Sequence, residues 1–337
     1  MKARLSKTWL RVFGLVIGLG SFGLALSPIP LQELREVMLE SADTHLLMCT
    51  AAWIVSIFFQ TWRWQMMLQW QKPVAFHTTL RLFILNRITN LLFPFRAGEG
   101  VRVVAAKQQL NINAPYLVAS VINERILNIV FLALIAFTLT FYLADLRKYQ
   151  AALLVIILAA TCVSVLFVWQ RQKKLKNGKV NSVRSHEFRG HKSRLQSFWH
   201  KFVQGMSIFK SPSVLMGSLL TSLASWFCVW FGVFILSQNL NPTQPIICAM
   251  AVLLFMNVVS LVHLTPSNIG PFQWGCILAF SYFGVNQTEA VGFSLVLQAV
   301  RIGAAFLVGI YANLQSSLSF NFGRQRRLLE VSSENTG

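Results

Sequence analysis

Acidic residues are scarce in this sequence, and charged residues of either sign are few. Among 337 residues there are 11 Asp and Glu against 30 Lys and Arg, and the four charged types together make up 12% of the chain. A water-soluble domain carries roughly a quarter charged residues, because charge covers its surface. The shortage of charge therefore excludes an ordinary soluble globular protein.

The motifs of metal-dependent, nucleotide-dependent and nucleophilic enzymes are also missing. The sequence contains no HExxH, no P-loop and no GxSxG, and its few carboxylates form no pair suited to hydrolysis or glycosyl transfer. Its five cysteines lie in apolar stretches without CxxC spacing, which indicates neither a disulfide framework nor a zinc site. We therefore expect that the protein is not an enzyme and binds no cofactor or metal.

Long apolar runs are what the sequence has in abundance, since 55% of its residues are hydrophobic. A helix needs roughly 20 mostly apolar residues to cross a bilayer core of about 30 Å. We expect an all-α polytopic membrane protein of about eight hydrophobic segments, with a single transmembrane domain over residues 1–320 and a tail at 321–337. The predicted full spans are 12–26, 46–62, 126–142, 151–169, 214–236 and 290–312.

Basic residues are concentrated in the segments that flank these runs, and the formal net charge is +19. Residues 171–210 form a hydrophilic loop in which Glu187 is the only acid among many Lys and Arg. The positive-inside rule places this loop and both chain ends in the cytosol, as in a multi-pass protein of the cytoplasmic (inner) membrane. No aromatic-basic recognition module accompanies the charge, so we expect no nucleic-acid partner.

Two apolar stretches are interrupted in a way that a full span tolerates poorly. Residues 82–95 are short and contain two asparagines and an arginine, and residues 246–285 are split by Pro and Gly at 265–271. A re-entrant hairpin explains the first stretch best. The second is either another such hairpin or an ordinary loop between two spans. Interrupted segments at matching positions in two halves are typical of an inverted repeat with a site near the midplane.

Arg301 stands near the middle of the last predicted span, three residues after Gln298 and on the same helical face. A charged side chain near the bilayer centre costs roughly 2.5–3.5 kcal/mol on insertion scales, so one that persists usually has a partner or lines a pathway. Snorkelling to an interface is the alternative, but both interfaces are distant. A functional or pairing role is favoured.

Two further groups of charged residues are candidates for a binding site. Arg96, Glu99 and Arg102 surround two glycines, where arginines and backbone N–H groups suit an anion such as phosphate. A basic cytosolic loop would have the same composition. Glu124 and Arg125 stand just before the predicted span at 126, where a plain helix cap is nearly as good an explanation as a functional role.

Four short motifs, in their order and spacing, resemble the lysylphosphatidylglycerol synthase transmembrane (flippase-like) family. They are 90–102, 124–128, 266–273 and 298–309. The resemblance covers essentially the whole chain and implies a polytopic domain that moves aminoacylated or other anionic-headgroup phospholipids between leaflets. Two-part members carry a separate cytosolic domain for aminoacyl transfer, and this chain resembles the translocation half only. Asn128 and Gln273 stand where many members carry an acid.

We therefore expect a flippase-like protein that translocates a phospholipid or lipid-linked anionic headgroup. The expected substrate-binding residues are Arg96, Glu99, Arg102, Glu124, Arg125 and Arg301, and the expected structural motif is Pro94, Gly98, Pro266 and Gly270. The partner would be a membrane phospholipid. An alternative is a non-transporting membrane partner of a glycosyl- or aminoacyl-transferase, and a membrane-embedded enzyme would require carboxylates or histidines converging in one cavity.

Overall fold

The structure is a computed structural model that describes residues 44–93, 95–150, 205, 211–260 and 265–334, and these form helices and connecting turns without a strand. The predicted spans at 12–26 and 151–169 lie outside the described residues. So do Pro94 and, apart from Gly205, the basic loop at 171–210.

Four of the described helices contain a stretch long and apolar enough to cross a membrane. They are α3 (Thr44–Gln69), α6 (Ala114–Leu139), α9 (Pro212–Ser237) and α12 (Gln287–Glu334). The α12 helix continues past the predicted end of the last span, so the predicted tail begins as its continuation. These helices confirm the prediction of an all-α, multi-pass membrane protein.

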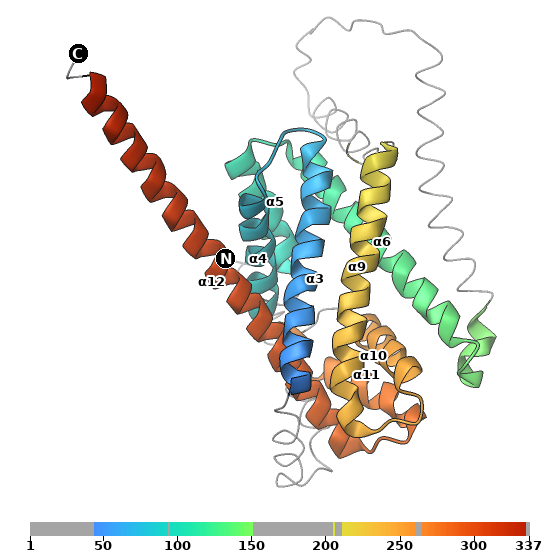
Figure 1. The fold of residues 1–337 in the computed structure, drawn as a ribbon. Helices are drawn as coiled ribbons and strands as arrows, with labels where there is room; N and C mark the ends of the chain where they lie inside the picture. The colour runs from blue at the N-terminus through green and yellow to red at the C-terminus, as the bar shows by residue number, and fades with distance from the viewer. Residues whose placement is uncertain (1–43, 94, 151–204, 206–210, 261–264, 335–337) are drawn as a thin grey trace, which may run out of the picture.

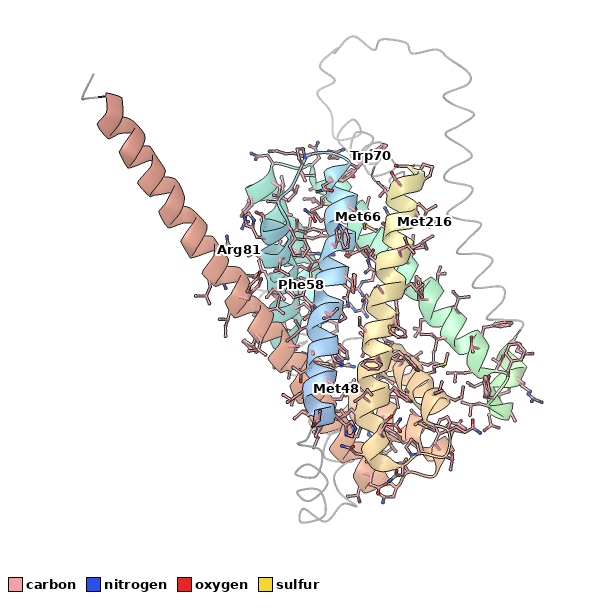
Figure 2. The ribbon with its side chains drawn as sticks, in the orientation of Figure 1. Met48, Phe58, Met66, Trp70, Arg81 and Met216 are labelled. Atoms are coloured by element: carbon pink, nitrogen blue, oxygen red, sulfur yellow. The ribbon has the colours of Figure 1, made fainter. Side chains whose placement is uncertain are left out.

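The outer surface of the long helices is apolar, as lipid requires. Figure 2 shows the side chains, with Met48 and Trp70 near opposite ends of α3 and Met216 on α9. These three large hydrophobic side chains are exposed. Exposed apolar surface on this scale is typical of a membrane or protein contact. The described helices therefore pack with one another on one side and meet acyl chains on the other.

Two pairs of shorter helices form helical hairpins between the long ones. The first pair is α4 (Phe76–Leu92) and α5 (Ala97–Leu110), and the second is α10 (Pro245–Val259) and α11 (Pro271–Phe280). At 1.5 Å per residue, α5, α10 and α11 are too short to cross a core of about 30 Å. The helices of each pair pack against each other. Two re-entrant hairpins are thus favoured over an ordinary loop between two full spans.

The turns of both hairpins depend on residues with positive φ. Phe95 and Arg96 have φ of 58° and 52°, and Ser267 and Gly270 have φ of 53° and 89°. A left-handed residue breaks the helical hydrogen-bond series, so the chain reverses there. The backbone N–H of Gly270 donates to Oε1 of Gln273 at 2.7 Å, which caps the start of α11.

The two halves of the described chain are arranged as inverted copies of one another. Each half consists of a long helix, a hairpin and a second long helix. The α4 helix packs on α12 and the α10 helix packs on α6, so each hairpin contacts the last long helix of the other half. In Figure 1 the two hairpins enter the bundle from opposite ends. This is the arrangement expected of an inverted repeat.

The position of Glu124 and Arg125 differs from the sequence-based expectation. The α6 helix begins at Ala114, after an extended Asn113 and with a proline in its first turn, which is a favourable helix start. Glu124 and Arg125 therefore lie in the interior of α6. The interpretation of Glu124 as a helix cap is wrong, because the apolar run at 126 continues a helix that begins at Ala114.

Candidate functional site

A cavity of about 510 Å³ lies between the two halves, where the tips of the hairpins approach each other. Its lining comes from α3, α4, α5, α6, α9, α10 and α12 and from both hairpin turns. The arginines that line it are Arg63, Arg87, Arg96, Arg102, Arg125 and Arg301. Among the described lining residues, Glu124 is the one carboxylate. The site is therefore strongly cationic.

One end of the cavity holds a buried ion cluster centred on Glu124. Its Oε2 accepts a hydrogen bond from Nη2 of Arg102 at 2.5 Å, and its Oε1 lies 3.6 Å from Nη2 of Arg63. The two arginines and the carboxylate are at most 5% exposed, and the Arg102 guanidinium lies 4.3 Å from the Trp64 ring centroid. Buried charges are tolerated when they are paired in this way.

Neutral side chains complete the environment of Arg63. Its Nη1 donates to Oδ1 of Asn128 at 3.1 Å and to Oγ of Ser222 at 2.9 Å. Asn128 therefore acts as a neutral acceptor for an arginine that already faces Glu124. Through these bonds Arg63 joins α3, α6 and α9, which belong to both halves of the repeat.

A second ion cluster lies at the start of α5 and is more exposed. Arg125 donates to Oε1 of Glu99, and Nη1 of Arg96 lies 3.8 Å from the same oxygen. The side chains of Arg96, Glu99 and Arg125 are 22%, 23% and 37% exposed. Partly exposed pairs contribute little to stability. Their effect is to hold Arg96 and Arg125 beside the cavity.

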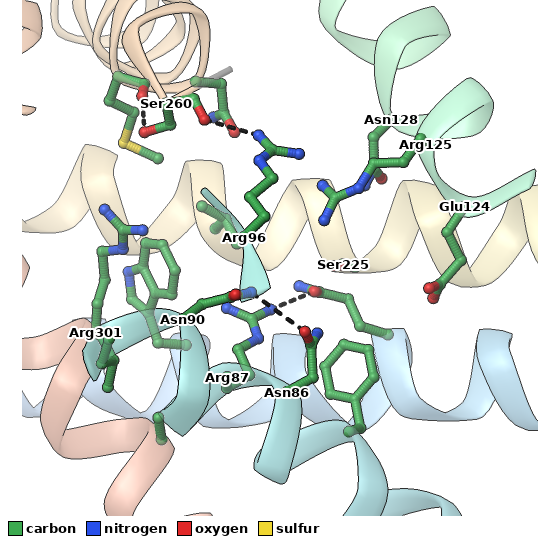
Figure 3. A pocket seen from close by; sticks show the side chains of 18 of the residues that line it. Asn86, Arg87, Asn90, Arg96, Glu124, Arg125, Asn128, Ser225, Ser260 and Arg301 are labelled. Carbon is green, nitrogen blue, oxygen red and sulfur yellow. Dashed lines mark hydrogen bonds between the residues drawn. The ribbon is translucent and has the colours of Figure 1, made fainter. Parts of the chain in front are cut away.

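Arg96 also connects the tips of the two hairpins. Its Nη2 donates to the backbone oxygen of Ser260 at the end of α10, at 2.7 Å (Figure 3). The Ser260 hydroxyl in turn accepts a hydrogen bond from Nδ2 of Asn268 in the second hairpin turn at 2.8 Å. The two turns that interrupt the membrane helices are therefore linked directly.

Arg301 and Arg87 have no carboxylate partner among the described residues. The Arg301 guanidinium lies 4.8 Å from the ring centroid of Phe272 and 5.5 Å from that of Trp53, and it forms no hydrogen bond within the described part of the chain. Arg87 donates to the side-chain oxygen of Gln60. Aromatic faces stabilise a guanidinium without neutralising it. Both charges are therefore available to a ligand.

Two amides fasten the second hairpin turn to α12. Nε2 of Gln273 donates to Oε1 of Gln298 at 2.7 Å, and Nε2 of Gln298 donates to the backbone oxygen of Ser267 at 3.1 Å. A carboxylate at position 273 could accept from Gly270 but could not donate to Gln298. The amide at this position is thus suited to holding the turn.

Three residues of the expected structural motif, Gly98, Pro266 and Gly270, are described, and each lies at a close helix contact or in a hairpin turn. A Cβ at Gly98 would lie 2.2 Å from the backbone oxygen of Asn86, so α4 and α5 approach too closely for any other residue. The Gly98 N–H donates to Oδ1 of Asn90 at 2.8 Å. Pro266 begins the short helix η4 (Pro266–Asn268) in the second turn, and Gly270 precedes α11.

All six residues expected to bind substrate lie in or beside the cavity, but their situations differ. Arg102 and Glu124 neutralise each other, whereas Arg301 has no ionic partner among the described residues. Sequence analysis missed Arg63 and Arg87, which also line the cavity. Arg63 lies one residue beyond the predicted span at 46–62, whereas α3 continues to Gln69 and buries it. Arg87 is the arginine that interrupts the apolar stretch 82–95, and Asn86 and Asn90 flank it within one helical turn.

Together, the inverted hairpins and the cationic cavity define a polytopic membrane protein with a polar site inside the bundle. The family described as Lysylphosphatidylglycerol synthase TM region matches residues 11–309, which is most of the chain. The chain belongs to this family. Comparison with curated proteins and with solved structures finds no match.

Proposed function

We propose that this protein moves a phospholipid, or a lipid-linked molecule with an anionic headgroup, between the two leaflets of the membrane. The observation that carries the proposal is the cavity at the meeting point of two oppositely inserted hairpins, lined by arginines from both halves. Arginine matches the geometry of phosphate oxygens with paired hydrogen bonds. Charged residues kept inside a membrane bundle usually mark a substrate pathway.

The remaining lining suits the apolar part of a lipid. Part of the wall comes from α6 and α9, where α6 leans away from α9 (Figure 1). The apolar residues of the lining there are Ile129, Leu132, Trp226 and Val229. A phosphate group can contact the arginines while acyl chains lie along this wall. An amphipathic ligand therefore fits the site better than a small soluble ion.

Within this mechanism the arginines have different tasks. Arg301 and Arg87 bind the headgroup, because neither has an ionic partner among the described residues. Glu124, Arg102 and Arg63 position the helices around the cavity. Arg96 links the two hairpin tips through Ser260. Inverted repeats open a central site to one side of the membrane and then to the other by rocking one half against the other. In this mechanism the hydrogen bond between Arg96 and Ser260 breaks during that motion.

The proposed location is the cytoplasmic membrane, with both ends of the chain in the cytosol. The support is the concentration of Lys and Arg in the N-terminal segment, residues 171–210 and the C-terminal tail. Reporter enzymes fused after residue 337 and within residues 171–210 would test it. Activity of a periplasm-specific reporter at either position would contradict this orientation.

The decisive test of function is leaflet transfer of labelled phospholipids in vesicles that contain only the purified protein. We expect Arg301→Gln to lower the transfer rate about tenfold or more, since a hydrogen bond to a charged group is worth about 1.5–3 kcal/mol. Arg81→Gln is the matched control, because Arg81 is exposed on the outside of α4 (Figure 2). Equal rates for the wild type and Arg301→Gln would remove the site assignment.

A non-transporting partner of a membrane-associated transferase remains the second candidate. The closed cluster of Glu124 with Arg102 and Arg63 favours it, because such a cluster also occurs in a rigid scaffold. The basic segment 171–210, which would bind the transferase or anionic lipid, lies almost entirely outside the described residues. Transfer by the purified protein alone would contradict this candidate, whereas transferase activity that depends on this chain without lipid transfer would support it.

A further inference from the structure

The carboxylates around the cavity are already occupied. Six arginines line the cavity, and the carboxylates that contact them among the described residues are Glu124 and Glu99. Glu124 is buried between Arg102 and Arg63, and Glu99 is shared by Arg125 and Arg96. A cationic group on a ligand would therefore find no free acid in the described lining.

Several aromatic faces beside the cavity already hold an arginine, and Trp226 in the apolar wall stacks on Phe131. Phe272 and Trp53 flank the guanidinium of Arg301, and Trp64 lies against that of Arg102. Aromatic faces are the usual alternative to carboxylates in sites that bind ammonium groups. A ligand ammonium would have to displace an arginine from them and would meet the repulsion of the remaining guanidinium groups.

The arginines of the lining outnumber these carboxylates, and Arg87 on α4 and Arg301 on α12 face no carboxylate among the described residues. They belong to different halves of the repeat, and both line the same cavity. A phosphodiester lipid carries a single negative charge and would neutralise one of them. A phosphomonoester carries about −1.5 to −2 near pH 7 and would neutralise both.

We infer that the cavity selects a lipid whose phosphate group carries two or more negative charges, a phosphomonoester or diphosphate, and discriminates against aminoacylated and zwitterionic phospholipids. The inference rests on the proposed function, because it names the substrate of the same site. In lysylphosphatidylglycerol the two lysyl ammonium groups outweigh the phosphodiester charge, so that headgroup is cationic and unsuited to this lining. The apolar residues on α6 and α9 identify the ligand as a lipid and not a free phosphate ion.

The test compares the transfer of four labelled lipids by the full chain in vesicles: phosphatidate, phosphatidylglycerol, phosphatidylethanolamine and lysylphosphatidylglycerol. We expect phosphatidate to be transferred fastest, about tenfold faster than lysylphosphatidylglycerol, from the strength of one hydrogen-bonded charge pair. Lysylphosphatidylglycerol transfer as fast as that of phosphatidate would overturn the inference and leave the transport function intact.

A separate binding measurement distinguishes failure of the inference from failure of the transport function. If the wild type transfers none of the four lipids, transport is contradicted, and native mass spectrometry of the protein with the same lipids then decides the inference. Preferential retention of phosphatidate supports it, and equal retention of all four overturns it. Inorganic phosphate provides the arm for a soluble ligand. Protection against heating by inorganic phosphate as strong as that by short-chain phosphatidate would overturn the assignment to a lipid.

Substitutions locate the selectivity. Arg87→Gln should lower the transfer of phosphatidate about tenfold but that of phosphatidylglycerol only about twofold, because a monoanion still has Arg301. Arg81→Gln, on the same helix but exposed, should change neither rate. If Arg87→Gln melts at the wild-type temperature and lowers phosphatidate and phosphatidylglycerol transfer equally, Arg87 does not bind the second negative charge of the phosphate.

Discussion

The two ends of the cavity contain the same residue type in opposite electrostatic situations. At one end Arg102 and Arg63 face the carboxylate of Glu124 and are almost fully buried. At the other end, well separated in Figure 3, Arg301 lies between aromatic rings without an ionic partner among the described residues. An arginine paired with a buried acid stabilises the helices, whereas one held by aromatic faces keeps its charge for a ligand.

This difference gives opposite expectations for stability and for transport at the two ends. Removing a charge at the paired end leaves other charges buried without compensation, which is costly. Removing the charge of Arg301 leaves no buried partner behind. Substitutions at the paired end should therefore impair folding, and substitutions at the unpaired end should impair lipid transfer alone.

The largest expected effect is that of Glu124→Gln. This change leaves Arg102 and Arg63 buried without a counter-charge, and breaking a buried ion pair costs about 3–5 kcal/mol. We expect a marked fall in the melting temperature of the purified protein and in its yield from membranes. Asn123→Ser, on the neighbouring residue of α6, is a suitable control for a polar substitution of a buried residue. A Glu124→Gln variant as stable as the wild type would contradict the stabilising role of the ion cluster around Glu124.

Arg301→Gln should have the opposite profile. Because Arg301 has no ionic partner among the described residues, its loss should leave the melting temperature unchanged or raise it. Transfer of phosphatidate should fall about tenfold or more, as for the loss of a hydrogen bond to a charged group. Thermal unfolding and transfer are measured on the same preparation. If this variant loses both thermal stability and lipid transfer, Arg301 stabilises the helices as Arg102 does.

The sequence was sufficient to predict the helical class and the first hairpin, but not the pairing of charges. Apolar runs broken by Pro, Gly and Asn are local features, and they predict the first hairpin and leave the second open between a hairpin and a loop joining two spans. Charge pairing depends on distance in space, and Glu124 lies far from Arg63 in sequence. Both residues also lie just outside the predicted spans and are nevertheless buried, because α3 and α6 extend beyond their apolar runs. A membrane helix can continue into a polar stretch that is buried inside the bundle. Hydrophobicity alone therefore does not reveal where such a helix begins.

Gly98→Ala tests whether the close packing of α4 against α5 determines the arrangement of the arginines around the cavity. The added methyl group would lie 2.2 Å from the backbone oxygen of Asn86, so the helices must separate. Forced overpacking of this kind costs about 1–3 kcal/mol. The shift would move Arg102 on α5 relative to Arg87 on α4. We therefore expect lower thermal stability together with slower lipid transfer.

Gly100→Ala is the matched control for this substitution, since a Cβ at Gly100 would meet nothing within 4 Å. Alanine is favoured over glycine in a helix by about 1 kcal/mol, so this variant should be as stable as the wild type or slightly more stable. If both alanine variants behave alike, the close approach of α4 and α5 at Gly98 does not control the cavity.

The smallest effect on thermal stability is expected for Glu99→Gln, which removes the more exposed of the two carboxylates. Its pairs with Arg125 and Arg96 are partly solvated, and such pairs contribute about 0–1 kcal/mol. We expect a shift in melting temperature far smaller than that of Glu124→Gln, diminishing further in high salt. Because the change removes the negative charge that Arg125 and Arg96 face, retention of phosphatidate in native mass spectra should increase. A large loss of stability would mean that both ion clusters hold the fold together and that exposure does not distinguish them.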